Sequence, residues 1–167
     1  EGEINFDNIS FKYKDGSDVF DGFKLNIKSG EKVGIVGHSG GGKTTITHLL
    51  LRFIDVDNGD ILIDGQSIYK VKQSDLRKIV SYVPQDPILF HRSIFDNIKY
   101  GKHDAAYEEV ISAAKRARVH DFVTTLPEGY ATMVGERGIK LSGGQRQRMA
   151  IARALLTESC IFILDEA

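Results

Sequence analysis

The sequence predicts an α/β domain in which a parallel sheet is flanked by helices, an antiparallel β portion comes first and a helical subdomain is inserted. Two strand-like runs within the first 27 residues indicate the antiparallel portion. Short apolar runs at 33–36 and 160–164 are typical of strands buried in a parallel sheet. Between 85 and 157, by contrast, the apolar residues mostly recur at helical spacing.

The first two strands are predicted at 4–13 and 23–27. Along the first, the alternation places Ile9, Phe11 and Tyr13 on one face. Because successive side chains of a strand point to opposite faces, this face packs against a core while the other meets water. The chain therefore begins with antiparallel β structure.

The next elements surround a glycine-rich loop. The run 33–36 predicts a short buried strand that ends at this loop, and apolar residues at helical spacing then predict a helix reaching Phe53. Asn-Gly and Asp-Gly turn signals flank a further strand at 60–63. Another strand at 79–83 stops at Pro84.

The helical subdomain contains two clear helices. The segment 105–119 is rich in Ala, Glu, Lys and Arg, which favour helices. The segment 144–156 carries apolar residues at helical spacing. The run 160–164 then returns the chain to the parallel sheet.

The loop GHSGGGKT, from Gly37 to Thr44, fits the pattern G-x-x-x-x-G-K-[ST] of nucleotide phosphate sites. Its glycines let backbone N–H groups approach phosphate oxygens, and the helix that follows adds the positive end of its dipole. Lys43 adds a charge, and the Thr44 hydroxyl can coordinate Mg²⁺. The predicted nucleotide ligands in this region are Gly37, His38, Ser39, Gly40, Gly41, Gly42, Lys43, Thr44 and Thr45.

Two carboxylates follow the last predicted strand. Asp165 stands at the strand end, where it can hold the same Mg²⁺ directly or through water. Transfer of a phosphoryl group to water also needs a group that orients or deprotonates that water. The neighbouring Glu166 is the predicted catalytic base.

A second glycine motif, LSGGQ, spans Leu141 to Gln145 and opens another predicted helix. Ser142 offers a hydroxyl group, and Gly143 and Gly144 offer accessible amides at a positive helix end. The motif predicts a second phosphate-binding surface, formed by Ser142, Gly143, Gly144 and Gln145.

In this order, the two glycine motifs and the apolar run ending in Asp165 and Glu166 resemble the nucleotide-binding domain of ABC transporters. The segment TMVGERG, from Thr132 to Gly138, resembles a loop of the exporter type that lies near the transmembrane domain. The resemblance covers essentially the whole chain. It implies that the C-terminal part of the family fold, with a dimer-contact loop and a phosphate-contacting histidine, is missing from these 167 residues.

The resemblance implies one ABC ATPase domain over 1–167. Its P-loop NTPase core would comprise 1–84 and 158–167, and its helical subdomain 85–157. Within VPQD, Gln85 resembles the family's Q-loop glutamine, which reaches the metal and the attacking water. Tyr13 matches the aromatic residue that stacks on adenine, with Phe11 as its competitor.

The implied function is that of an ATP-binding and ATP-hydrolysing motor domain of an ABC exporter, with ATP and Mg²⁺ as cofactors. One implied partner is the transmembrane domain of the exporter, fused N-terminally in the parent protein, at the cytoplasmic face of the cell membrane. The other is a second nucleotide-binding domain in a head-to-tail dimer, in which Ser142 of one subunit closes over the ATP of the other.

Composition narrows the remaining choices. A net charge of −1 over 167 residues gives no overall positive field for nucleic acid, so no nucleic-acid partner is expected. No stretch approaches the ~20 apolar residues that cross a bilayer as a helix. Two alternatives stay open, which are a nucleotide-binding fragment that does not hydrolyse ATP and an ABC ATPase associated with nucleic acid or ribosomes.

Overall fold

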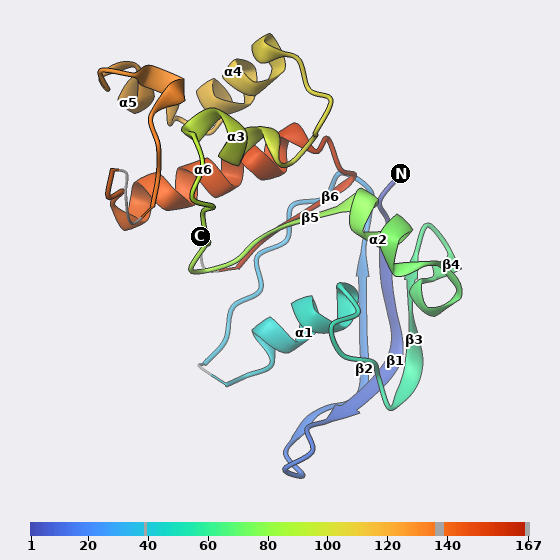
Figure 1. Cartoon of the computed structure of the whole chain (residues 1–167). Helices are drawn as coiled ribbons and strands as arrows, with labels where there is room; N and C mark the ends of the chain where they lie inside the picture. Colours follow the sequence, from blue (N-terminus) through green and yellow to red (C-terminus); the bar gives the residue numbers. More distant parts are fainter. Residues whose placement is uncertain (39, 136–138, 166–167) are drawn as a thin grey trace. The chain divides into compact units, whose positions relative to one another are not determined.

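The computed structural model describes residues 1–38, 40–135 and 139–165 (Figure 1). The chain divides into two compact units, Glu1–Val80 and Ser81–Ala167, each with its own sheet or strand pair and helices.

The first unit is built on a four-stranded antiparallel sheet with the strand order β2-β1-β3-β4. Its strands are β1 (Ile4–Lys12), β2 (Asp18–Ile27), β3 (Asn58–Ile63) and β4 (Gln66–Ser67). The predicted antiparallel β portion is therefore confirmed. The second strand begins five residues earlier than the predicted 23–27, because its start pairs with the end of β1.

A β-bulge changes the alternation within β1. The pairing register shifts between Phe6 and Ile9, and Asn8 there has a φ of +53°. One extra residue moves the apolar side chains before and after it onto the same face. The buried side chains of β1 are Ile4, Phe6, Ile9 and Phe11. Opposite the bulge stands Gly59, where an added Cβ would overlap the backbone oxygen of Asn8.

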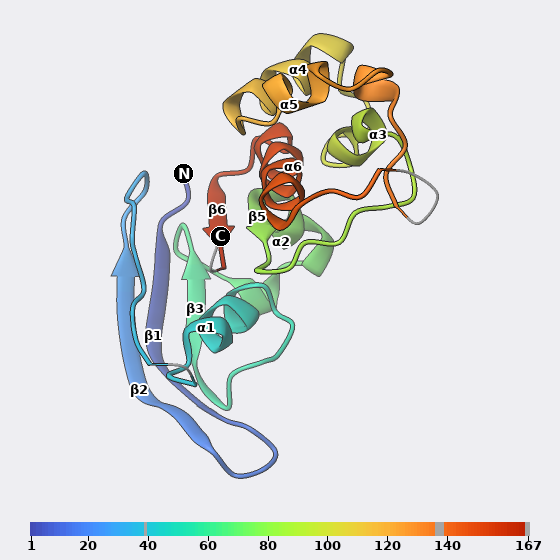
Figure 2. The ribbon, with the colours of Figure 1, turned by 90° about the vertical axis from the view of Figure 1, so that its left-hand side faces the viewer.

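Helix α1 (Lys43–Leu50) lies beside one face of this sheet (Figure 2). Its buried apolar residues, Ile46, Leu49 and Leu50, recur at helical spacing, as the sequence predicts, although the helix ends before Phe53. Beyond β3 and β4 come a 3-10 turn, η1 (Ile68–Lys70), and helix α2 (Gln73–Ile79).

The predicted strand at 33–36 is wrong. Residues 31–38 belong to neither sheet, and Val33, Ile35 and Val36 are 45%, 43% and 92% exposed. An extended run becomes a strand only when its backbone pairs with a neighbour. Neither sheet supplies a neighbour for this run in the described part of the chain.

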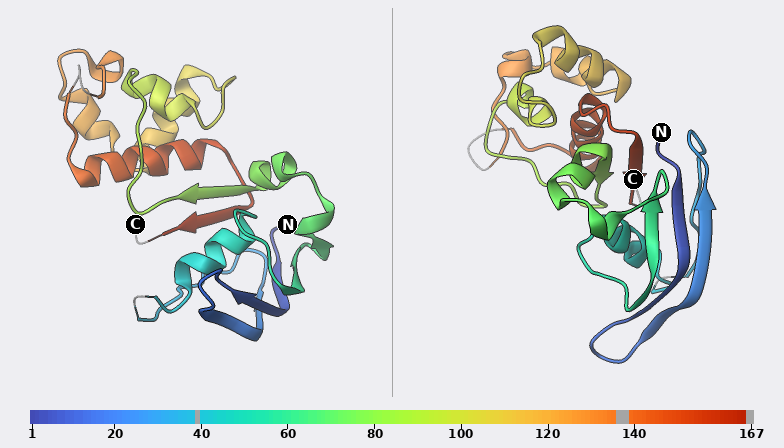
Figure 3. Two further views of the ribbon diagram at one scale, coloured as in Figure 1. Left: turned by 60° about the horizontal axis from the view of Figure 1, so that its bottom comes forward. Right: turned by 90° about the vertical axis from the view of Figure 1, so that its right-hand side faces the viewer.

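The second unit contains the parallel strands β5 (Val80–Val83) and β6 (Ile161–Leu164), which lie side by side and point the same way (Figure 3). Both coincide with predicted strands. The described residues of this unit also form the helices α3 (Ile94–Lys99), α4 (Tyr107–Arg116), α5 (His120–Thr124) and α6 (Gly143–Leu156). A 3-10 turn, η2 (Gly129–Ala131), follows α5.

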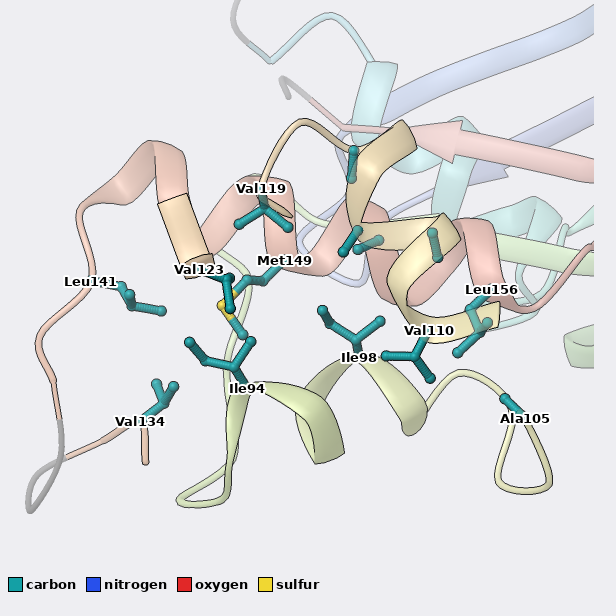
Figure 4. Packing of buried hydrophobic residues seen from close by; sticks show 14 residues of the cluster. Ile94, Ile98, Ala105, Val110, Val119, Val123, Val134, Leu141, Met149 and Leu156 are labelled. Carbon is teal, nitrogen blue, oxygen red and sulfur yellow. The ribbon is translucent and has the colours of Figure 1, made fainter. Parts of the chain in front are cut away.

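The helices of the second unit share one hydrophobic core (Figure 4). It includes Met149 of α6, Ile94 and Ile98 of α3 and Val110 of α4, all fully buried. Burial of large aliphatic side chains contributes about 1.5–3 kcal/mol each. This core fixes α6, and therefore the second glycine motif at its start.

Candidate functional site

The phosphate loop, Gly37 to Thr44, folds around its own lysine. The Lys43 ammonium group donates to the backbone oxygens of Gly37 and His38, at 2.8 and 2.9 Å. A further turn forms where the Gly41 N–H donates to the His38 oxygen at 3.0 Å. The lysine side chain therefore folds back onto the beginning of the loop, while Ser39 lies outside the described residues.

Gly42 has to be glycine in this loop. Its φ is +83°, and an added Cβ would lie 2.9 Å from side-chain atoms of both Val19 and Phe20 in β2. It is also the N-cap of α1, so no capping side chain of its own covers the first backbone N–H groups. These amides and the positive helix end remain suited to an anion.

The two threonines after the lysine have different surroundings. Thr44 is exposed, whereas Thr45 is 95% buried and its hydroxyl shares a 2.9 Å hydrogen bond with the Tyr13 hydroxyl. Tyr13 itself is 40% exposed, whereas Phe11 is only 6% exposed. The two rings pack edge to face, with their centres 5.0 Å apart. Of the two candidate adenine platforms, Tyr13 is the one with an accessible ring.

Asp165 is fixed to β5 by two contacts. Its backbone N–H donates to the Val83 oxygen at 3.0 Å, and its Oδ2 accepts from the Tyr82 hydroxyl at 3.1 Å. Burial, and then the hydrogen bond to Asp165, raise the pKa of Tyr82 to about 12. Tyr82 is therefore a protonated donor at neutral pH. Glu166, the predicted base, lies outside the described residues.

Gln85 is exposed and comes two residues after Val83, beyond the end of β5. Pro84, between them, accepts a hydrogen bond from the Gln147 side chain of α6 at 3.4 Å. The ends of the two parallel strands thus bring the Gln85 segment and Asp165 to the same edge of the strand pair.

The second glycine motif, Leu141 to Gln145, forms the start of the 14-residue helix α6. Ser142 is its N-cap, and its hydroxyl accepts from the Gln145 N–H at 3.2 Å. In return the Gln145 side chain accepts from the Ser142 N–H at 2.8 Å, which completes a capping box. Ser142, Gly143 and Gly144 are all exposed. The motif therefore presents its hydroxyl and glycine backbone at a helix N-terminus.

The segment that resembles an exporter loop is partly described. Thr132 and Val134 pair with the chain around Ser93, with Ile94 N–H donating to the Thr132 oxygen and Val134 N–H to the Arg92 oxygen, both at 3.0 Å. Residues 136–138 lie outside the described residues.

The predicted site residues therefore form two groups. The phosphate loop, Thr45 and Tyr13 belong to the first unit, and Asp165, Gln85 and the second glycine motif belong to the second. Sequence reasoning missed Tyr82, which contacts Asp165 across a sequence separation of 83 residues. Its place one residue before Val83 in an apolar run carries no signal of that contact.

The predicted metal ligands Thr44 and Asp165 offer oxygen atoms, which suit Mg²⁺. They are too few to hold a metal ion without other ligands. Among the described residues no group of three or more His, Cys, Asp or Glu side chains could hold a metal ion. Magnesium usually keeps several waters and takes one or two protein oxygens together with substrate phosphates. The exposed Thr44 hydroxyl and the Asp165 carboxylate are donors of that kind. Among the described residues, every helix is too short or too polar to span a bilayer.

Comparisons with known proteins agree with the motifs. The family model described as "ABC transporter" matches residues 20–167. An "Uncharacterized ABC transporter ATP-binding protein" of Haemophilus influenzae is 50% identical over 100% of this chain and 28% of its own length. The human "ATP-binding cassette sub-family B member 6" is 48% identical over 100% of this chain and 20% of its own length. The chain thus spans less than a third of these relatives.

A solved structure is similar in sequence and in fold. It is described as "Structure of a bacterial Atm1-family ABC exporter with ATP bound". It is 48% identical to this chain, with a TM-score of 0.94 over 99% of this chain and 29% of its own.

Proposed function

Since this chain belongs to the ABC transporter family as an ATP-binding domain of the exporter type, we propose that it is the ATP-hydrolysing motor of an exporter. ATP binding would close a dimer of such domains and hydrolysis would reopen it. The observation that carries the proposal is the phosphate loop, in which the Lys43 ammonium group at the start of α1 is held by the backbone oxygens of Gly37 and His38.

The phosphates of ATP would occupy the phosphate loop. The glycine backbone and the N–H groups at the start of α1 would donate to the phosphate oxygens, and Lys43 would turn from the Gly37 and His38 carbonyls towards them. The adenine would stack on the exposed ring of Tyr13, whose hydroxyl is anchored on Thr45.

Thr44, Gln85 and Asp165 would hold Mg²⁺, which when bound neutralises charge on the phosphates. Gln85 would also contact the attacking water, and Glu166 would act as the base. The nucleotide-binding core would comprise 1–84 and 158–167, and the helical subdomain 85–157.

Two partners complete the proposal. The second domain of a head-to-tail dimer would present its Ser142, Gly143, Gly144 and Gln145 to the terminal phosphate of this domain's ATP, and this chain would do the same in return. The transmembrane domain of the exporter would hold both at the cytoplasmic face of the membrane. The similarity to a solved structure described as an ABC exporter supports this assignment.

ATP affinity tests the proposal directly. Lys43→Ala should weaken ATP binding by about 10-fold or more, because a charge-assisted hydrogen bond to phosphate is lost. Lys24→Ala, which removes an exposed lysine of β2, is the matched control and should bind as wild type. Equal ATP affinity in all three proteins would contradict the phosphate site.

ATP hydrolysis needs a separate measurement, because the main alternative function is a fragment that binds ATP without hydrolysing it. In the intact protein, Glu166→Gln should retain ATP affinity and lose steady phosphate release. Phosphate release at the wild-type rate would remove Glu166 from the proposed role.

A further inference from the structure

Tyr82 contacts the carboxylate of Asp165 although it belongs to none of the motifs described above. Tyr82 belongs to β5, Asp165 directly follows the neighbouring strand β6, and the hydroxyl-to-carboxylate distance is 3.1 Å. The same strand β5 also holds the Asp165 backbone through the Val83 oxygen. Main chain and side chain of Asp165 are therefore both fixed by consecutive residues of one strand.

The strand orients Tyr82 away from α6. On either side of it, the Ser81 hydroxyl donates to the Ala154 oxygen of α6 at 3.2 Å, and Val83 packs in a cluster with Ala150 and Ala154. Because side chains alternate along a strand, Tyr82 points to the opposite face. Its ring is partly buried there, which limits the positions open to its hydroxyl.

We propose that Tyr82 is a positioning residue for the metal, acting through the hydrogen bond between its hydroxyl and Oδ2 of Asp165. The proposal rests on the proposed function, in which Asp165 binds Mg²⁺. A donor on Oδ2 holds the carboxylate in one orientation and leaves Oδ1 to face the metal or a metal-bound water. Partners behind a metal ligand typically change metal affinity by about 10- to 100-fold when they are removed.

The test is Tyr82→Phe in the full chain, with the affinity for ATP measured without metal and over a Mg²⁺ titration. Mg²⁺ should increase the ATP affinity of the variant as much as that of wild type, but at an about 10-fold higher Mg²⁺ concentration. This value is the lower end of the roughly 10- to 100-fold range, because the lost donor is uncharged. ATP affinity without metal should stay at the wild-type value. Mn²⁺ binding followed by electron paramagnetic resonance gives a second readout that does not depend on turnover.

Tyr130→Phe is the matched control. It also removes one hydroxyl from the second unit, where the Tyr130 oxygen is hydrogen-bonded to His120 Nδ1 at 2.9 Å and not to Asp165. Its Mg²⁺ dependence should equal that of wild type. Thermal unfolding of both variants separates a general loss of stability from an effect on the metal.

A double-mutant cycle with Asp165→Asn decides whether the effect passes through this carboxylate. In the Asp165→Asn background, Tyr82→Phe should cause no further loss of Mg²⁺ affinity. The positioning role would be wrong if Tyr82→Phe bound Mg²⁺ as tightly as wild type or more tightly. It would also be wrong if Tyr82→Phe lost the same Mg²⁺ affinity in the wild-type and Asp165→Asn backgrounds. Either result would leave the proposed metal site itself in place. If wild type bound ATP equally with and without Mg²⁺, the proposed metal site would fail together with the positioning role.

Discussion

The guanidinium group of Arg153 donates two hydrogen bonds to Asn97, one to its backbone oxygen at 2.8 Å and one to its side-chain oxygen at 3.1 Å. Asn97 is fully buried, accepts from the Phe90 N–H at 2.8 Å and donates to the Phe90 and Ser93 oxygens, both at 3.0 Å. The Arg153 guanidinium also lies over the Phe90 ring, 5.1 Å from its centre. The pair thus joins α3, α6 and the segment that precedes α3.

Asn97→Ala should lower the free energy of unfolding by about 3 kcal/mol, because buried N–H and C=O groups lose their partners at a cost of about 1–3 kcal/mol each. Urea denaturation measures this change. Asn26→Ala, on the exposed side of β2, is the control and should change the value by less than about 0.5 kcal/mol. A similar small effect of both substitutions would show that the network around Asn97 adds no net stability.

Ser142 can be tested separately as a helix cap and as a nucleotide ligand. Ser142→Ala should cost about 1 kcal/mol of stability because α6 loses its N-cap. Ser142→Asp should keep the cap and the stability. It should nevertheless weaken ATP-dependent dimerisation, because a carboxylate would face phosphate in the proposed dimer. Sedimentation with ATP measures the second effect, and wild-type dimerisation by Ser142→Asp would contradict a contact between Ser142 and the partner's nucleotide.

The Glu109 carboxylate should make stability depend on pH. It accepts from Lys102 Nζ at 2.6 Å and from the Ala106 N–H at 2.7 Å, at the start of α4. These bonds lower the pKa of Glu109 below 4.5 and help to raise the pKa of Lys102 above 10.5. The stabilisation is therefore fully present at neutral pH. It is lost as the pH falls through the lowered pKa of Glu109, or rises through the raised pKa of Lys102.

Melting temperatures of wild type and Glu109→Gln measure this contribution. The variant should melt below wild type at pH 7, and the difference in melting temperature should narrow as the pH is lowered towards 3, because more of the wild-type carboxyl group is then protonated. Glu108→Gln, at the neighbouring exposed position of the same helix turn, should melt like wild type at both pH values. A gap of constant size from pH 7 to pH 3 would exclude the carboxylate charge as its cause.

Gly101→Ala should destabilise the second unit by about 1–3 kcal/mol or more, because an added Cβ would overlap the backbone oxygen of Arg153. Gly34→Ala is the control, since its Cβ would meet no atom within 4 Å in the described part of the chain. Chemical denaturation compares the two. Equal stability would mean that the backbones at Gly101 and Arg153 can separate without cost.

Local patterns predict much of the fold and of the site. The alternating strands, the two longer helices of the second unit and both glycine motifs follow from spacing within the chain. The run at 33–36 shows the limit, because an apolar run is a strand only if another strand pairs with it. Helices α2, α3 and α5 have seven residues or fewer, too short for their period to be recognised.

Contacts between distant residues were beyond sequence reasoning for a different reason. Arg153 and Asn97 are 56 positions apart, and Tyr82 and Asp165 are 83 apart. The first pair forms because α6 packs beside α3, and the second because β6 pairs with β5. No spacing rule within a single segment connects such residues.

The capping box at Ser142 gives its hydroxyl group a direction. One lone pair of the oxygen is occupied by the Gln145 N–H, which leaves the hydroxyl proton and a second lone pair for other partners. The proton can donate to an anion, and the backbone N–H groups and positive dipole end at the same helix start favour an anion as well. The bond that caps α6 therefore also holds the Ser142 hydroxyl group beside the positive end of the helix, where both can act on one negatively charged group.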